Sequence, residues 1–361
     1  MEGTQGRDNG AETNSPLEVM IQQKENMLPS EDGTLRILYN NCNGLQPGEL
    51  LKAKLKQRIE KKKDGYLSES VQYTKVRGMC GTMKKLNTNI MCLSETQTAW
   101  ENTGVRDAIA KEFRRNDRYT SLTGSSSKAQ AFSVVKPGGT AIIADGNWSG
   151  RIIKRGEDPY GLGRWSYIVI EGKKRTKLMV ICGYRCCKGQ RIQSVGALTA
   201  YSQQYHLLKK RGKKYPNPQK QFITDLKKFI SESIIDANEI LLCVDANEEW
   251  NEDSAIKAMS DSLGLIDIVS QEISPPPPTY ERKGVSRRID FILGTKSVAE
   301  SIKSIMTSPT EIGQSIGDHN AIIIDINIQL LFHLQDHDSM SPTSRKLKSE
   351  DIKGVERYTK N

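Results

Sequence analysis

The feature that most constrains the fold is a series of short apolar runs, rich in Ile, Val and Leu, separated by segments with a helical pattern. Runs of this kind, bounded by turn residues, are typical of buried strands. One continuous alternation of strands and helices favours a single α/β domain. Strands are predicted at residues 35–39, 89–93, 139–144, 166–170, 177–182, 239–244, 289–293 and 321–326. Helices are predicted at residues 49–63, 70–87, 197–210, 218–235 and 253–263.

Both ends of the chain are polar. Residues 1–33 have no apolar period and carry more acids than bases, which predicts a disordered acidic arm. Residues 331–361 are predicted to form a polar flexible tail, leaving residues 34–330 as the folded domain. No apolar run approaches the ~20 residues of a membrane span, and the N-terminus lacks the pattern of a signal peptide. We therefore expect an intracellular protein that does not enter membranes.

The net charge of +10 is concentrated between the two polar ends. Such an excess favours a polyanionic partner, with a merely solvated lysine-rich surface as the alternative. The segment at residues 49–63 is strongly basic and is a candidate for lying on a phosphate backbone. Lys61, Lys62 and Lys63 are therefore candidate substrate-binding residues.

Seven cysteines are spread along the chain without any Cys-x-x-Cys pair. Several lie in strand-like apolar runs, which predicts buried reduced thiols rather than disulfides or a zinc site. A soft-metal site at Cys182, Cys186 and Cys187 is the alternative, and the scarcity of histidines argues against it.

Polar residues recur where the predicted strands end. A buried strand that ends in a carboxylate is costly unless that charge has a partner, and neighbouring strand ends lie close together, so these groups could converge in a cleft. Hard oxygen ligands select Mg²⁺ or Mn²⁺ over zinc. Such a set supports hydrolysis of a phosphate ester, with an Asp activating water and a His–Asp pair stabilising developing negative charge. The residues are Asn41, Asn43, Glu95, Asp245, Asn247, Asp290, Asp318 and His319.

Most of these residues also have an ordinary structural explanation. Asn41 and Asn43 are residue types common in strand-to-loop turns, and Asp245 with Asn247 fits an Asx turn. Glu95 fits the first turn of a helix. Their joint occurrence at several strand ends is what favours a shared site.

The ordered blocks NNCNGL, LSETQ, GYR, VDANE, SRRIDFIL and GDHNAI resemble the signature of the endonuclease/exonuclease/phosphatase superfamily, which has the DNase-I-like fold. Their order and spacing match over residues 34–328. Within the superfamily the chain is most similar in appearance to endonucleases of non-LTR retrotransposons and to apurinic/apyrimidinic endonucleases. The resemblance implies an α/β four-layer sandwich of two mainly antiparallel sheets flanked by helices.

The resemblance also implies a metal site and its cation. It assigns Glu95 as the metal ligand, with Asn41 in support and Asp318 near the metal. The cation implied is Mg²⁺, with Mn²⁺ as the alternative.

Catalytic roles follow from the same resemblance. Asp245 would orient or deprotonate water, and Asn247 would hold the scissile phosphate. His319 would contact a phosphate oxygen, oriented by an acid for which the family pattern favours Asp290. Tyr184 falls where the family places a tyrosine that assists at the phosphate.

The resemblance also assigns residues to substrate binding, and the chain departs from the family pattern at several positions. Asn43, Arg185 and Arg287 are assigned to substrate binding. Val244 replaces the usual glycine before the catalytic Asp, and Gly317 replaces the usual serine before the Asp-His pair. The GYRCCKG block, which contains Tyr184, lacks the proline common in the family.

The predicted function is a Mg²⁺-dependent DNA endonuclease that leaves 3′-hydroxyl ends. We expect a nuclear monomer associated with a retroelement, with a reverse transcriptase acting in trans. One alternative is a phosphatase or phospholipase of the same superfamily acting on inositol phosphates or lipid head groups. Another is a catalytically silent nucleic-acid-binding domain, against which the filled catalytic positions argue.

Overall fold

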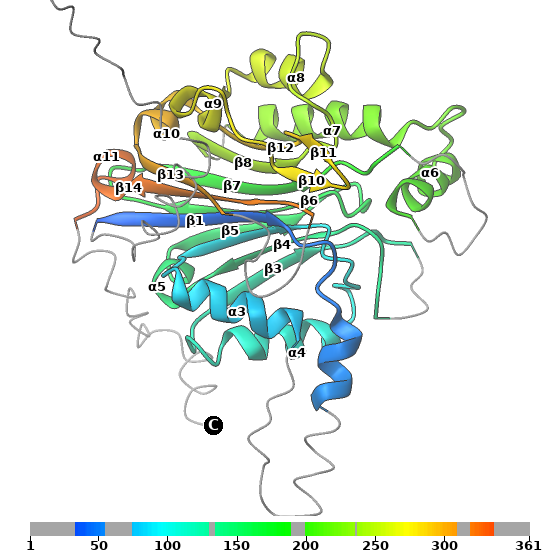
Figure 1. The fold of residues 1–361 in the computed structure, drawn as a ribbon, viewed down its shortest axis with the longest axis horizontal. Helices are drawn as coiled ribbons and strands as arrows, with labels where there is room; N and C mark the ends of the chain where they lie inside the picture. The colour runs from blue at the N-terminus through cyan, green and yellow to red at the C-terminus, as the bar shows by residue number, and fades with distance from the viewer. Residues whose placement is uncertain are drawn as a thin grey trace, which may run out of the picture.

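The computed structural model describes residues 33–54, 74–129, 134–188, 199–234, 237–308 and 318–335. Within them, two six-stranded sheets lie face to face and helices cover their outer faces (Figure 1). Each sheet holds one parallel pair of strands, and its other neighbours are antiparallel. The predicted four-layer sandwich is therefore confirmed.

The two sheets have similar plans, with the parallel pair near the middle of each. The first has the order β13 (Ile302–Ser308), β14 (Ala321–Asn327), β1 (Thr34–Asn41), β2 (Ile90–Ser94), β4 (Thr140–Ala144) and β3 (Ser121–Ser125). The second has the order β5 (Ile152–Glu157), β6 (Trp165–Glu171), β7 (Lys177–Tyr184), β8 (Glu239–Asp245), β12 (Asp290–Gly294) and β9 (Ile266–Asp267). The parallel pairs are β1–β2 and β7–β8. A separate hairpin joins β10 (Tyr280–Arg282) to β11 (Val285–Arg287).

The outer helices bury one apolar stripe each. In α7 (Pro218–Ser233), Phe222, Leu226 and Ile230 are four residues apart and pack on the second sheet beside α8 (Ala255–Leu263). The side chain of Asn217 accepts the N–H of Lys220 and so caps the start of α7. On the first sheet, α3 (Lys75–Lys85) and α4 (Thr103–Phe113) do the same.

The remaining helices are shorter or lie beside the sandwich. They are α5 (Gly146–Ser149), α6 (Ala200–Lys210), α9 (Ile268–Glu272), α10 (Lys296–Glu300) and α11 (Ile328–Phe332), together with helical residues 47–54. None of the helices in the described ranges is long and apolar enough to cross a membrane.

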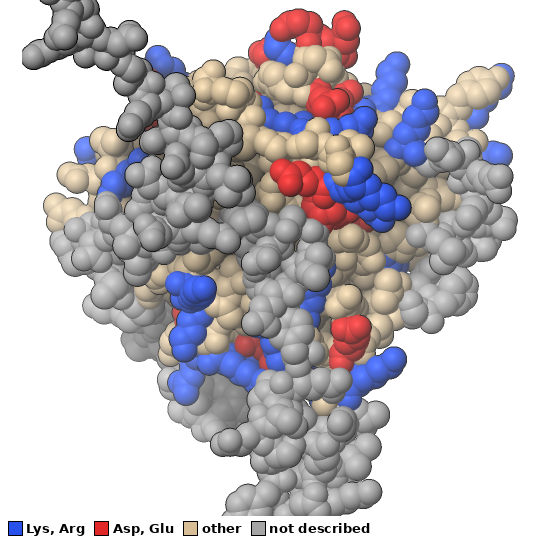
Figure 2. Space-filling view, in the orientation of Figure 1, with Lys and Arg blue, Asp and Glu red and all other residues tan. Residues whose placement is uncertain are grey.

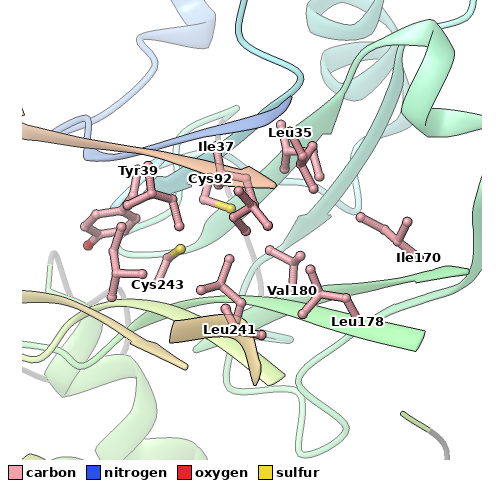
Figure 3. Packing of buried hydrophobic residues seen from close by; sticks show 14 of the residues in the cluster. Leu35, Ile37, Tyr39, Cys92, Ile170, Leu178, Val180, Leu241 and Cys243 are labelled. Carbon is pink, nitrogen blue, oxygen red and sulfur yellow. The ribbon is translucent and has the colours of Figure 1, made fainter. Parts of the chain in front are cut away.

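The main core lies between the sheets and is built from alternate strand residues. Ile37 and Tyr39 of β1 face Val180 of β7 and Leu241 and Cys243 of β8 across the gap (Figure 3). Because side chains alternate along a strand, every second residue of each central strand enters this layer. The same alternation decides whether the side chain of the last residue of each strand points into this layer or away from it.

All the predicted strands form, and several strands that were not predicted form as well. The longest of these, β3, β5 and β13, each lie at an edge of a sheet. An edge strand is partly solvated and tolerates polar residues, so its apolar signal is weak. The longest helix without a predicted counterpart is α4.

The polar ends of the chain fall largely outside the described residues. Residues 1–32 and 336–361 lie there, as do Lys61, Lys62 and Lys63. Leu331, Phe332 and Leu334 are buried against the inter-sheet core. These three residues therefore belong to the packed core rather than to the tail predicted from residue 331, because the end of α11 covers the rim of the sandwich.

Candidate active site

The stripe that fills the inter-sheet core continues into polar side chains at one end of the sandwich. On β1 the inward residues Ile37 and Tyr39 are followed by Asn41, and on β8 Cys243 is followed by Asp245. Alternation directs Asn41 and Asp245 into the same layer as the core. Both are almost fully buried. The strand ends therefore bring polar groups from both sheets together.

Asp290 lies beside Asp245 because of the register of the second sheet. β12 runs antiparallel to β8, and Asp290 is the pairing partner of Asp245. The Asp290 carboxylate accepts a hydrogen bond from the Tyr39 hydroxyl at 2.9 Å and lies 2.7 Å from Nδ1 of His319. The hydroxyl of Thr279 accepts the backbone N–H of Asp290. Asp290 is thus held rigidly, and its carboxylate orients the imidazole of His319.

Asn41 connects the two sheets. Its Nδ2 donates to Oδ2 of Asp245 at 2.8 Å and to Oε2 of Glu95 at 3.2 Å. The same Nδ2 lies 3.4 Å from Nε2 of His319. Its Oδ1 accepts the backbone N–H of Asn43 at 2.9 Å. One amide is therefore hydrogen-bonded to three of the predicted site residues, Asp245, Glu95 and Asn43, and lies against a fourth, His319.

Asn247 lies on the other side of Asp245. Its backbone N–H donates to Oδ1 of Asp245 at 2.8 Å, and its Nδ2 donates to Oδ2 of Asp245 at 3.1 Å. Nδ2 also donates to the backbone oxygen of Arg185 at 2.8 Å. Since an amide carries only two N–H donors, both are engaged by the protein here. Binding a phosphate through Nδ2 would require Asn247 to release one of these bonds.

The loops of the site hold four non-glycine residues in the left-handed region. The φ angles are 41° at Asn43, 49° at Glu95, 48° at Gln97 and 48° at Asn247. This conformation is uncommon for residues other than glycine, and such residues concentrate at functional sites. No helix begins after Glu95, so the alternative explanation of Glu95 as a helix-start acid does not apply.

The electrostatics of the site are those of crowded, desolvated carboxylates. Burial and the neighbouring charge of Asp290 raise the pKa of Asp245 well above its ordinary value. Burial alone would lower the pKa of His319, but the carboxylates of Asp290, Asp245 and Asp318 outweigh it and raise that pKa to about 9. Burial and the charge of Glu95 raise the pKa of Tyr184 well above its ordinary value. His319 is therefore a cation and Tyr184 a neutral phenol at neutral pH.

Three other predicted residues lie around this cluster. Tyr184 ends β7 opposite Asp245 and is buried. Asp318 is partly exposed, and its Oδ2 lies 3.5 Å from the guanidinium of Arg282 on the hairpin. Arg185 is buried and donates to the backbone oxygen of Ala246 at 2.9 Å, which holds the loop after β8 instead of pointing at solvent.

Arg287 is exposed on the β10–β11 hairpin, where it pairs with Tyr280. The hairpin is attached beside the site, because Tyr280 pairs with His319 and its ring lies 5.0 Å from the imidazole. Figure 2 shows acidic and basic side chains next to one another on the face that carries β10 and β11. The hairpin thus presents mixed charge rather than a purely basic surface.

Three residues that touch the cluster were not predicted from the sequence. Tyr39 donates to Asp290, and Gln97 donates to Oε1 of Glu95 at 3.4 Å. Cys187 is exposed, unlike the other six cysteines, and its thiol donates to Oδ1 of Asn247 at 2.8 Å. The spacing of two between Tyr39 and Asn41, and between Glu95 and Gln97, was the available signal. Cys187 corrects the expectation that all the thiols are buried, because it lies past the end of β7.

The donors of this cluster fit a hard divalent cation. The carboxylates of Asp245 and Asp290 and a ring nitrogen of His319 come within 4.8 Å of one another, and the carboxylate of Glu95 is joined to this group through Asn41. A charged imidazole has no lone pair for a metal, so the candidate ligands are the carboxylates. No cysteine belongs to a comparable cluster in the described ranges. Carboxylate and amide oxygens are the ligands that Mg²⁺ and Mn²⁺ prefer. The crowding that raises the pKa of Asp245 would be relieved by a cation.

The layers, the strand order and this polar end define a DNase-I-like α/β sandwich. The sequence itself matches no family model and no curated protein. Solved structures with this fold include the catalytic domain of APE2 from Xenopus laevis, at 14% identity and a TM-score of 0.53, covering 81% of this chain and 92% of that one. The AP endonuclease LMAP from Leishmania major is 11% identical with a TM-score of 0.52, over 83% and 92% of the two chains. An AP endonuclease from Archaeoglobus fulgidus is 14% identical with a TM-score of 0.51, over 80% and 98%. These similarities confirm the predicted fold.

Proposed function

We propose that the chain is a divalent-metal-dependent phosphodiester hydrolase that cuts DNA strands endonucleolytically. One observation carries the proposal: three carboxylates, from Glu95, Asp245 and Asp290, converge with His319 around the single amide of Asn41. A stable fold gains nothing from crowding carboxylates in a desolvated place. Such crowding is expected where a cation and a phosphate are to be bound.

The predicted metal position involves Glu95, with Asn41 in support and Asp318 nearby. Nδ2 of Asn41, which donates to Glu95, holds that carboxylate in place. When bound, the cation would neutralise charge on the phosphate oxygens.

Asp245 is the group proposed to orient or deprotonate the attacking water. Its Oδ1 is held by the backbone N–H of Asn247, and its Oδ2 by the amides of Asn41 and Asn247. These bonds fix the direction in which the carboxylate can accept a proton. Burial and the charge of Asp290 raise its pKa, which makes the carboxylate a stronger base toward water.

His319 is proposed to stabilise negative charge on the phosphate. Its Nδ1 is engaged by Asp290 at 2.7 Å, which holds the ring in its charged form. Nε2 lies 3.4 Å from Nδ2 of Asn41, but both atoms are then donors, so this contact cannot satisfy Nε2. The N–H at Nε2 therefore has a free donor direction for a substrate oxygen.

DNA is the substrate class that the charge distribution supports. The chain carries a net +10, and three basic residues, Lys209, Lys210 and Arg211, follow one another at the end of α6. A long polyanion needs cations along a track, whereas a small inositol phosphate needs them near the metal alone. Three solved structures of similar fold are named as AP endonucleases or as APE2, which favours the same class. Cleavage to 3′-hydroxyl ends, a nuclear location, a monomeric state and a retroelement role with a reverse transcriptase in trans stay predictions.

The proposal is tested by parallel incubation with supercoiled plasmid, abasic duplex, RNA and inositol phosphates, with Mg²⁺ or with EDTA. We expect Mg²⁺-dependent nicking of DNA, and its loss in Glu95→Gln, which keeps the shape of the side chain and removes the charged ligand. A saturating metal at a hundred times its Kd should also stabilise the wild type by about 2.7 kcal/mol, and Glu95→Gln should lose most of that increment. Activity that survives EDTA would contradict the metal assignment, and rapid hydrolysis of inositol phosphates with intact plasmid would favour a phosphatase.

A further inference from the structure

A cavity of about 840 Å³ lies where the edge strands of the two sheets approach each other, beside the catalytic cluster rather than inside it. β3 lines it with Thr123 and Gly124, and β5 lines it with Arg155 and Glu157. The loop before α4 contributes Trp100. A volume of this size is in the range of small-molecule and cofactor sites, roughly 300–1,000 Å³.

The cavity is connected to the loop that carries the predicted metal ligand. Nε1 of Trp100 donates to the hydroxyl of Thr96 at 3.0 Å, and Thr96 directly follows Glu95. On the other wall, the backbone N–H of Lys136 donates to the backbone oxygen of Gln97 at 3.2 Å. A ligand in the cavity would therefore contact the loop that also carries Glu95.

The lining has an excess of positive charge. Four cations line it against the carboxylates of Glu101 and Glu157. Lys136 is buried, pairs with Glu101, and donates to the backbone oxygen of Ser127 at 2.6 Å. The other three cations are Arg106, Lys128 and Arg155, and neither of the last two forms an ion pair in the described part of the chain. These three exposed cations make the cavity suited to an anion.

A buried hydroxyl on the lining also has no hydrogen-bond partner. Thr123 is 9% exposed, and its Oγ1 is unpaired among the described residues. Buried polar side chains are nearly always hydrogen-bonded, so an unpaired one calls for an explanation. Asn102, the N-cap of α4, lines the same cavity, and a helix N-terminus adds partial positive charge there.

We propose that this cavity binds the phosphate-bearing part of a nucleotide, through Arg106, Lys128 and Arg155 with the hydroxyl of Thr123. The proposal rests on the proposed function, in which that nucleotide is a neighbour of the scissile phosphate in the bound DNA strand. A free mononucleotide presents the same chemistry and is the other possible source. The cavity would then extend the recognised length of DNA past the catalytic centre.

The first experiment removes two of these cations in the double variant Arg106→Ala/Arg155→Ala. Affinity for a labelled short DNA duplex is measured against salt in the Glu95→Gln background, so that the duplex is not cut. We expect binding to weaken about tenfold at low salt. The slope of log affinity against log salt should fall by about 1.8, or 0.9 for each phosphate that the protein no longer neutralises. A second titration measures binding of AMP by calorimetry.

The matched control is Lys228→Ala/Lys296→Ala, which removes two exposed charges on α7 and α10 that do not line the cavity. A loss in the duplex titration beyond this control supports the strand-binding source. A loss confined to AMP supports the free nucleotide. If neither titration differs from the control, the cavity proposal is overturned.

The hydrolysis of bis(p-nitrophenyl) phosphate separates this proposal from the proposed function. This diester is too small to reach the cavity from the catalytic centre, so the double variant with native Glu95 should hydrolyse it at the wild-type rate. If the wild type cleaves neither this diester nor DNA, the proposed function fails, while the two binding titrations still decide the cavity.

Thr123→Val provides an independent test, because it removes only one hydroxyl group from the cavity. Valine keeps the shape of the side chain, so the fold should survive. The variant should bind the preferred ligand about fivefold more weakly, as expected when one hydrogen bond is removed. Unchanged affinity would remove Thr123 from the site, and unchanged affinity in both variants would overturn the proposal.

Discussion

Two clusters of buried charged residues in this chain are similar in composition. They differ in whether the buried carboxylates surround a permanently charged cation. In the first, the guanidinium of Arg164 donates to Asp158 at 2.7 Å and to Asp225 at 2.8 Å, and the ring of Trp165 lies 4.6 Å from it. In the second, Asp245 and Asp290 lie side by side with one imidazole between them and Glu95 close by. Both clusters are desolvated, but only the first has a permanent cation at its centre.

The difference separates a structural use of buried charge from a functional one. Asp158 also accepts the backbone N–H groups of Tyr160 and Leu162, so its charge is balanced within the protein. At the catalytic cluster, burial and Asp290 raise the pKa of Asp245 instead. Buried carboxylates without a balancing cation are expected to lower the stability of the fold. The same uncompensated negative charge is what allows the cluster to bind a cation and to react. Three changes test this contrast, and a fourth measures the effect of burial on a single carboxylate outside both clusters.

The largest effect is expected for Asp245→Asn. The amide keeps the size of the side chain and removes the group proposed to take a proton from water, so kcat should fall about 10³- to 10⁴-fold with little change in DNA binding. The amide cannot accept on both of its terminal atoms as the carboxylate does, so at least one hydrogen bond from Asn41 or Asn247 is lost. This loss offsets the gain from removing one of two adjacent buried carboxylates, and the Tm should change little. The measurements are the rate at saturating DNA, equilibrium binding and thermal unfolding. A loss confined to binding would show that Asp245 is a structural residue.

Arg164→Met should have the opposite character. It leaves Asp158 and Asp225 buried without their cation, which should cost about 3–5 kcal/mol of unfolding free energy. The kcat of the folded fraction should remain within a few-fold of wild type. Denaturant unfolding measures the loss, with the exposed Arg118→Met as the control. An unfolding free energy equal to that of the control would show that the two clusters do not differ in this way.

His319→Ala should act on the rate, by a factor of about 10² or more, as the loss of a preorganised donor does. His206→Ala on α6 is the matched control, since His206 packs beside Tyr205 away from the catalytic groups. Single-turnover rates with plasmid DNA distinguish the two variants. A His319 variant as active as the His206 control would make His319 structural.

The smallest effect concerns Asp145, a buried carboxylate outside both clusters. Burial raises its pKa to about 6, against the hydrogen bonds from Asn89 and Trp148. An acid whose pKa is higher in the folded than in the unfolded state binds its proton more tightly when folded. Stability from this group is therefore fully present below pH ~4 and is lost as the pH rises through ~6, by about 2 kcal/mol between pH 4 and 7. Asp145→Asn should abolish this change, measured as unfolding free energy between pH 4 and 7; an unchanged pH dependence would assign it to other groups.

The sequence predicted the fold well where strands are buried on both faces. The runs that became β1, β7 and β8 are apolar at their centres, with Ile and Leu in each, and this signal survives without tertiary context. It failed for edge strands such as β5, whose residues IIKRGE carry little apolar period because one side meets solvent. The burial of Phe332 was also missed, since it depends on where α11 meets the sandwich.

For the candidate site, the sequence could name the polar strand ends but not their partners. Asn41 and Asp245 are 204 residues apart, and their 2.8 Å hydrogen bond exists because two separate sheets pack face to face. The same holds for His319 with Asp290, whose pairing follows from the loop that also positions Tyr280. Tyr39 and Gln97 lay two residues from predicted site residues, but a spacing of two does not show which neighbour reaches the cluster.

The order of residues is enough to establish which chemistry is available: which strands are buried, which side chains terminate them, and an excess of positive charge outside the site. The tertiary structure alone decided how that chemistry is combined. Asp290 faces Asp245 because of one antiparallel register, Arg185 turns inward to hold a loop, and the edge strands β3 and β5 enclose a cavity that no run of residues foretells. The physical reason is that strand patterns depend on neighbours two residues apart, whereas sheet packing brings together groups hundreds of residues apart whose charges then set one another's pKa.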